Sequence, residues 1–210
     1  MHIELTEMLR CPEPHEESFL VMSTGEMSGR MVRSGILGCP VCRREFRIVK
    51  GVVHFSGCEM RDAGCETSPP RHPASRIPHP VDPPTLQALL DLSGPGGYVV
   101  LVGSAARHAV GLAGLMGGIH FVGVNAPPGV EELPILSLLR CETMIPLRHA
   151  MARSVVVGPD AADAAWIAEA SRVLLRGRRL VIEGEVVEGA PPAGVSKRAA
   201  GEGLWVGDKQ

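Results

Sequence analysis

Short, continuous apolar runs in the second half of the chain constrain its fold more than any other feature. Residues 98–102 (YVVLV) and 119–124 (IHFVGV) are such runs, and shorter ones lie at 154–157 and 179–183. A strand that is apolar on both sides has to be covered on both faces, as in a parallel sheet flanked by helices. Because helical patterns alternate with these runs over about 100 residues, the sequence predicts a mostly parallel α/β sheet.

The helices between these strands are predicted from apolar spacing and from capping residues. Asp160 suits the N-cap of a helix over 160–175, and Gly177 suits its C-terminal stop. Four weaker elements are also expected: a helix over 85–92, a helix over 105–117, a strand near 142–147 and a hairpin at the sheet edge over 195–206.

Composition divides the chain into three parts. Residues 1–57 hold a group of cysteine and histidine residues, residues 58–84 are rich in proline, and residues 85–210 carry the predicted sheet. Seven prolines lie between residues 66 and 84, and proline-rich chain is extended and semi-rigid. We therefore expect a small β-rich N-terminal domain, a linker, and a reduced Rossmann-like α/β domain.

A metal site is predicted in the first of these parts. Cys39 and Cys42 form a Cys-x-x-Cys turn that aims two thiolates at one point, and Cys11 and His15 lie upstream within reach of a hairpin. Four such ligands can close a tetrahedral zinc site, and the bound metal would help so short a segment to fold. Two alternatives stay open: a redox-active cysteine pair, and a ribbon that has lost its metal. The remaining candidates for a missing ligand are Cys58 and Cys65.

Three short stretches of this part resemble the zinc-ribbon activator family of methyltransferases. They are residues 8–12 (MLRCP), 38–42 (GCPVC) and 46–53 (FRIVKGVV). The family pairs two cysteine turns around zinc, and here Pro14 stands where its second cysteine would be. The resemblance therefore implies that His15 takes the place of that cysteine in the zinc site.

Residues 96–183 resemble the class I S-adenosylmethionine-dependent methyltransferases, with the best match at 168–182. The resemblance implies that the cofactor would be held after the first strand by Gly103 and Ser104 and after the second strand by Asn125. The family has a glycine-rich loop at the first place, where a Cβ atom would collide with the ligand, and an acid at the second. The resemblance assigns no catalytic residue to this chain.

These departures at the cofactor loop favour a protein that has kept the fold and lost the chemistry. We expect a pseudoenzyme, non-catalytic or weakly catalytic, that acts as a binding or assembly subunit. The reason is steric, because side chains after the first strand occupy the volume of the cofactor. One alternative is an active methyltransferase for RNA, protein or a small molecule, with Asp160 as a polar substrate contact. Another is an activator subunit that docks a separate methyltransferase through the apolar, glycine-rich edge 109–126.

Charge and composition limit the partners. The formal charge is −2 and aromatic residues make up 3% of the chain, so neither a general basic field nor a base-stacking surface indicates nucleic-acid binding. Six bases face one acid within residues 27–50. Cross-strand pairing with the acidic residues 1–26 is the simpler interpretation, and a basic face for RNA or an acidic partner is the alternative. A protein partner or a homo-oligomer is therefore expected.

Membrane contact is not expected from the sequence. The longest stretch without charged residues contains histidines, glycines and a pair of prolines, which suit a buried α/β core better than a membrane span. The N-terminus lacks the pattern of a secretory signal. The sequence therefore predicts a cytoplasmic protein.

Overall fold

The computed structural model describes residues 1–55, 81–184 and 192–210. Most of the predicted linker over 58–84 lies outside these residues, and so do Cys58 and Cys65. The elements, with η denoting a 3₁₀ helix, are η1 (Ile3–Met8), β1 (Val21–Thr24), β2 (Met27–Ser28), β3 (Met31–Val32), β4 (Gly35–Gly38), β5 (Glu45–Val49), β6 (Val52–His54), α1 (Pro83–Leu90), β7 (Tyr98–Val102), η2 (Gly103–His108), α2 (Ala109–Leu115), β8 (His120–Val124), β9 (Leu136–Arg140), β10 (Ala152–Val157), η3 (Pro159–Ala161), α3 (Ala164–Val173), β11 (Leu174–Glu183), β12 (Val195–Gly201) and β13 (Leu204–Lys209).

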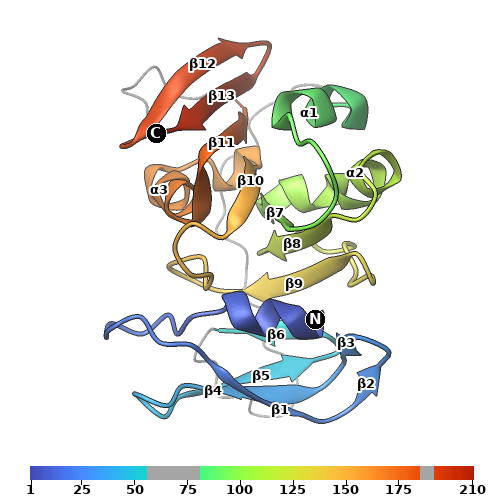
Figure 1. The fold of residues 1–210 in the computed structure, drawn as a ribbon, viewed down its shortest axis with the longest axis vertical. Helices are drawn as coiled ribbons and strands as arrows, with labels where there is room; N and C mark the ends of the chain where they lie inside the picture. Colours follow the sequence, from blue (N-terminus) through green and yellow to red (C-terminus); the bar gives the residue numbers. More distant parts are fainter. Residues whose placement is uncertain (56–80, 185–191) are drawn as a thin grey trace.

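Eleven strands form one sheet, in the order β1-β4-β5-β6-β9-β8-β7-β10-β11-β13-β12 (Figure 1). The strands from β6 to β11 in that order are parallel to one another, and β13 is antiparallel to both β11 and β12. The predicted mostly parallel α/β sheet is therefore confirmed, with the four apolar runs as β7, β8, β10 and β11 and the edge hairpin as β12 and β13. The strand order reverses between β7 and β10, which defines a switch point at the carboxyl ends of these two strands.

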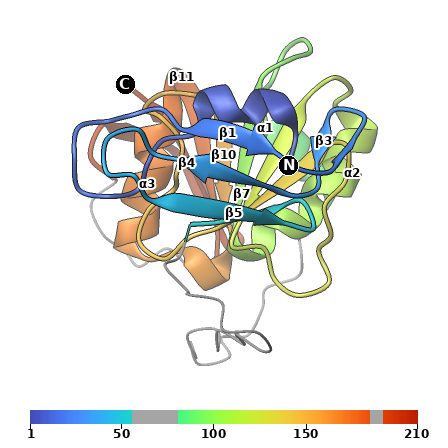
Figure 2. The ribbon, with the colours of Figure 1, turned by 90° about the horizontal axis from the view of Figure 1, so that it is seen from below.

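Helices cover the two faces of this sheet unequally. Figure 2 shows α2 and α3 on opposite sides of the sheet. Leu86 and Leu90 of α1 and Leu112 of α2 are buried with Val99 and Leu101 of β7 in one apolar cluster, and η1 and α3 pack on the other face. No helix follows β8 or β9 within the described residues 125–151. The Rossmann-like part is therefore reduced, as predicted.

The N-terminal part (residues 1–55) is joined to the rest of the molecule through the sheet itself. β6 pairs in parallel with β9, with Val52 opposite Leu138 and Val53 opposite Leu139. Val53 is fully buried in a cluster that also contains Val122 of β8. The two parts thus share one sheet and one core (Figure 1). The division of the chain into domains at residues 57 and 85 stays a prediction.

Some of the charges in the N-terminal part form ion pairs. Arg44 lies 3.1 Å from Glu13, which is the kind of pairing between the basic and acidic segments that the simpler interpretation predicts. Arg33 instead reaches out of the N-terminal part and lies 3.3 Å from Glu132, in the loop before β9. Among the described residues, no helix is both long and apolar enough to span a bilayer.

The strand expected near 142–147 is wrong, because the third parallel strand is β9, six residues earlier in the chain. Ser137 interrupts the apolar pattern of β9 and hides it from sequence reasoning. In the structure its buried hydroxyl accepts a hydrogen bond from the backbone N–H of His2 at 2.8 Å and lies 2.9 Å from Nε2 of His120. A buried polar group with such partners costs little stability, so the strand tolerates it.

The helix expected over 160–175 is wrong at both ends. The N-cap of α3 is Asp163, whose carboxylate accepts the N–H of Trp166 at 2.9 Å. After Val173 the chain passes directly into β11, where Gly177 has a φ of +69° at a bulge. The helix expected over 105–117 begins instead as the 3₁₀ helix η2.

The segment 109–126 does not present a free edge. Its strand β8 pairs with β7 on one side and with β9 on the other, and β9 is covered in turn by β6. The backbone groups of β8 are therefore not free to pair with a partner, whereas Val110 and Leu115 of α2 are exposed. Docking of a partner at this segment stays a prediction.

Candidate metal centre and cofactor site

The four predicted metal ligands converge on one point. Candidate ligand atoms of Cys11, His15, Cys39 and Cys42 all lie within 4.8 Å of one another. Sγ of Cys11 lies 3.7 Å from Sγ of Cys42, and Sγ of Cys39 lies 3.4 Å from Nε2 of His15. Two sulfurs that are each about 2.3 Å from a tetrahedral ion would be about 3.8 Å apart. These side chains therefore fit a tetrahedral metal ion.

Backbone groups shape the turn between Cys39 and Cys42. The N–H of Arg43 donates to the carbonyl oxygen of Cys39, and the N–H of Cys39 donates to that of Arg44, both at 2.9 Å. Burial opposes ionisation of Cys39, but hydrogen bonds from the backbone N–H groups of Cys42 and Val41 stabilise its thiolate, and the pKa of Cys39 falls to about 6. The turn thus favours the thiolate form of Cys39, which is the form that binds a metal ion.

Cys11 and His15 approach from the opposite loop. Burial raises the pKa of the Cys11 thiol to about 12. A bound cation would let closely spaced thiols ionise together, because ligand deprotonation is coupled to metal binding. Nδ1 of His15 lies 2.6 Å from the carbonyl oxygen of Glu16, so this nitrogen carries the proton and Nε2 is free to bind a metal.

A second candidate site lies at the switch point between β7 and β10. Asp160, in η3 after β10, directs its carboxylate at Ser104 in the first turn after β7. Oδ1 of Asp160 accepts the backbone N–H of Ser104 at 2.8 Å and also accepts the Ser104 hydroxyl. Asp160 is therefore not the helix cap that the sequence predicts, and its partner lies 56 residues earlier in the chain.

Two glycines allow these loops to approach. Gly103 has a φ of +63°, and a Cβ atom added to it would lie 2.6 Å from Oδ1 of Asp160. A Cβ atom on Gly158 would lie 2.7 Å from the backbone nitrogen of Ala105. Gly103 thus permits close contact between the turns after β7 and β10. Its expected contact with a cofactor stays a prediction.

Asn125, at the end of β8, is also engaged within the chain. It has a φ of +53°. Its Nδ2 donates to the carbonyl oxygen of Cys141 at 2.8 Å, and its Oδ1 accepts the N–H of Cys141 at 3.0 Å. The carboxamide therefore ties the end of β8 to the end of β9. Burial raises the pKa of the Cys141 thiol to about 12, so this cysteine is a neutral core residue.

The three residues predicted to bind S-adenosylmethionine do lie at the carboxyl edge of the sheet, where ligands bind in open α/β folds. Their polar groups, however, are bonded to other residues of the chain, Ser104 to Asp160 and Asn125 to Cys141. Their binding of an adenosyl cofactor stays a prediction.

A polar pair that sequence reasoning missed lies farther along the same edge. Nε2 of His108 lies 2.8 Å from Oε1 of Glu183 at the end of β11, and both side chains are largely buried. This carboxylate oxygen has no aligned hydrogen-bond donor, so the two groups are in close contact without a well-formed hydrogen bond. The two residues are 75 positions apart, and no local pattern in the sequence indicates that they meet.

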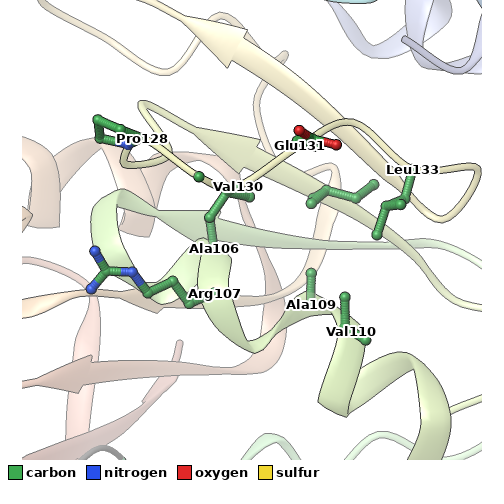
Figure 3. A pocket seen from close by; sticks show the side chains of 10 residues that line it. Ala106, Arg107, Ala109, Val110, Pro128, Val130, Glu131 and Leu133 are labelled. Atoms are coloured by element: carbon green, nitrogen blue, oxygen red, sulfur yellow. The ribbon is translucent and has the colours of Figure 1, made fainter.

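A pocket of about 430 Å³ lies beside the turn after β7 (Figure 3). Figure 3 shows Arg107 directed away from the apolar walls, so its side chain does not fill the space. Neither Ser104 nor Asp160 lines this pocket. The apolar walls come from the helical turn and from the loop before β9: Ala106, Ala109, Val110, Val130 and Leu133.

Comparisons with known proteins find structural similarity alone. No protein family and no curated protein matches the sequence. A chain from the complex between the Haloferax volcanii Trm112 methyltransferase activator and a methyltransferase aligns at 19% identity with a TM-score of 0.40, covering 48% of this chain and 50% of that one. A SAM-dependent methyltransferase from Aquifex aeolicus aligns at 16% identity with a TM-score of 0.45, covering 61% and 88%. A geranyl diphosphate C-methyltransferase from Streptomyces coelicolor aligns at 17% identity with a TM-score of 0.40, covering 48% and 41%.

These similarities are low, and the class of the protein follows from its own sheet. Counted along the chain from β7, the parallel strands and the final hairpin have the spatial order 3-2-1-4-5-7-6, with the seventh strand antiparallel. The first five places of this order, 3-2-1-4-5, are those of a Rossmann fold. The chain therefore has a Rossmann-like fold that resembles that of methyltransferases, and it carries a Cys/His cluster able to hold a metal ion.

Proposed function

We propose that this chain is a zinc-binding, methyltransferase-like subunit that binds or assembles with a partner and does not itself transfer methyl groups. The observation that carries the proposal is the pair of hydrogen bonds from Ser104 to the carboxylate of Asp160. The first N–H groups after a parallel strand at the switch point are the donors that face a ligand. In this chain the carboxylate of Asp160 accepts the hydrogen bond from the N–H of Ser104 in place of a ligand.

A cofactor would have to displace this carboxylate. Hydrogen bonds to a charged acceptor contribute about 1.5–3 kcal/mol each, and the exposure of Asp160 brings them to the lower end of that range. Two such bonds together would oppose cofactor binding by about 3 kcal/mol, which weakens the dissociation constant by about a hundredfold. The carboxamide of Asn125 is also engaged within the chain, because each of its polar atoms makes a hydrogen bond to the backbone of Cys141.

Zinc is the metal that this proposal assigns to the Cys/His cluster. Three sulfurs and one imidazole nitrogen are a donor set of structural zinc sites, which have no open position for substrate. These residues would therefore stabilise the N-terminal part and take no part in a reaction. Reduced thiols at a metal site also favour the cytoplasm predicted from the sequence.

The activator alternative is less well supported. An activator needs a surface that is free to contact a separate methyltransferase. Here β6 pairs with β9 of the same chain, and η1 packs in the core that both parts share. The N-terminal part therefore already occupies a sheet edge in its own chain.

The second candidate function is an active S-adenosylmethionine-dependent methyltransferase. It is favoured by the complete strand order and by the positive φ of Gly103 directly after β7. If Asp160 were to swing away, the N–H of Ser104 would be released at the place where a ligand binds in this fold class.

Isothermal titration with S-adenosylhomocysteine, which resembles the cofactor and does not react, separates the two candidates. The proposal expects no measurable binding by the zinc-loaded wild-type chain, and tighter binding by Asp160→Ala, because that change releases the Ser104 donor. Asp163→Ser is the matched control, since serine also caps a helix and the same charge is removed close by. Micromolar binding by the wild-type chain would contradict the proposal and support the active enzyme.

A further inference from the structure

One corner of the sheet carries positive charge that neither the metal cluster nor the switch point uses. β13 is antiparallel to β11 and β12, so it ends where those two strands begin, beside the C-terminus (Figure 1). We call the four cationic residues of this place the basic corner: Arg176, Arg178, Lys197 and Lys209.

Strand register brings these side chains together. Arg179 lies opposite Asp208, and Arg178 and Lys209 are the next residues of these two antiparallel strands. Lys197 lies opposite Gly207 on the next strand pair, two residues from Lys209 along β13. Like charges close together on adjacent strands destabilise a sheet. Pairing within the sheet therefore does not account for this gathering of charge.

The amine of Lys209 is held at the end of α3, where it donates to the carbonyl oxygens of Arg172 at 3.3 Å and Leu174 at 2.6 Å. Both acceptors are neutral, so its charge is not cancelled. Burial lowers the pKa of Lys209, and the nearby charges of Arg176 and Arg172 lower it further. Within the basic corner, Arg176 thus lies close enough to Lys209 for the two charges to repel each other.

The acids at this end of the sheet are already in use. Asp208 lies 3.1 Å from Arg198 and 3.6 Å from Arg179, and Glu169 lies 2.7 Å from Arg172. Within the part of the chain that the structure describes, no residue of the basic corner forms an ion pair. The formal charge of −2 for the whole chain conceals this local excess.

The surroundings favour nucleic acid over an acidic protein. A protein interface has an apolar centre, but the exposed large apolar side chains of the described residues lie in the N-terminal part and in α2, away from β11, β12 and β13. Arginine forks match phosphate oxygens in pairs, and Arg176 and Arg178 flank Gly177 at the bulge of β11. No exposed aromatic ring lies on these three strands to stack bases, which single-strand binding would use.

We propose that the basic corner binds the phosphodiester backbone of a nucleic-acid duplex without reading its sequence. RNA and DNA duplexes share this chemistry, so either backbone is a suitable ligand. The inference is independent of the metal and of the proposed loss of methyl transfer, because its residues belong to neither site.

Fluorescence anisotropy with the full, zinc-loaded chain tests the proposal, with labelled RNA and DNA duplexes of about 20 base pairs as probes. Four phosphate contacts would give a slope of log K against log salt of about −3.6 for a DNA duplex. Arg176→Gln combined with Arg178→Gln is expected to reduce this slope by about 2 and to weaken binding at low salt at least tenfold for either duplex. Both side chains lack ion-pair partners among the described residues, so a thermal melt should show no loss of stability.

The matched control combines Arg47→Gln with Lys50→Gln, which removes two exposed cations of the N-terminal part. This control is expected to bind as the wild type does. Loss of binding in the control, with no loss in the corner variant, would overturn the proposal and place the contact on the N-terminal part. Absence of binding to both duplexes at low salt would also overturn it, as would binding to poly-glutamate in place of the duplexes, which would indicate an acidic protein partner.

Discussion

Substituting Val53 tests whether the two parts of the chain fold as one unit. Val53 lies in the middle of β6, is fully buried, and faces Leu139 of β9 and Ile48 of β5 across the sheet. Val53→Ala removes two methyl groups, a loss of about 1.6 kcal/mol at about 0.8 kcal/mol for each. The cavity that remains adds to this loss, so we expect a total of about 2–3 kcal/mol.

Thermal unfolding followed by tryptophan fluorescence shows whether the substitution in the N-terminal part also destabilises the C-terminal part. Both tryptophans, Trp166 and Trp205, lie in the C-terminal part, far from residue 53 in the sequence. At about 2–4 °C per kcal/mol for a chain of this size, the midpoint of the tryptophan transition should fall by about 4–12 °C. Val21→Ala is the matched control, because Val21 is 55% exposed on β1 and its truncation should change stability by less than about 0.5 kcal/mol.

The reasoning fails if the tryptophan transition of Val53→Ala coincides with that of the wild type while the zinc leaves at a lower temperature. That result would mean that the N-terminal part unfolds independently. It would support separate domains at residues 1–57 and 85–210 in spite of the shared sheet.

Three further predictions concern the metal, the switch point and pH. The purified chain should contain one zinc ion by elemental analysis, and Cys39→Ser should lose it; a wild-type chain without zinc, or a variant that keeps the metal, would contradict the site. Asp160→Ala should lower the free energy of unfolding by about 1–3 kcal/mol in urea titrations, because the N–H and hydroxyl of Ser104 lose a charged acceptor, whereas equal stability would show that the contact is weak. Burial, followed by the charge of His2, lowers the pKa of His120 to about 4, so the neutral ring stabilises the fold fully above its ordinary pKa of 6.5 and this stability is lost as the pH falls from 6.5 towards 4. Urea titrations across this range should show the decline, and a pH dependence unchanged in His120→Asn would refute the assignment.

Local patterns predicted much of the fold and one of the two sites. The apolar runs at 98–102 and 119–124 became β7 and β8 with little change of boundary, because a strand buried on both faces leaves a continuous apolar signal. The Cys-x-x-Cys turn is equally local, and its two partners, Cys11 and His15, are drawn to it in the structure. By contrast, β9 was missed because Ser137 breaks its pattern and is satisfied by partners that no local window contains.

Sequence alone thus determined that this chain forms a parallel sheet flanked by helices and carries a Cys-x-x-Cys turn, since both depend on residues within a few positions of one another. Tertiary structure decided how these parts meet. The pairing of β6 with β9 brings together segments more than eighty residues apart. The bond between Asp160 and Ser104 depends on two loops that become neighbours only when β7 and β10 lie side by side. Such contacts arise from the packing of the whole sheet, and no short stretch of sequence contains the information that selects them.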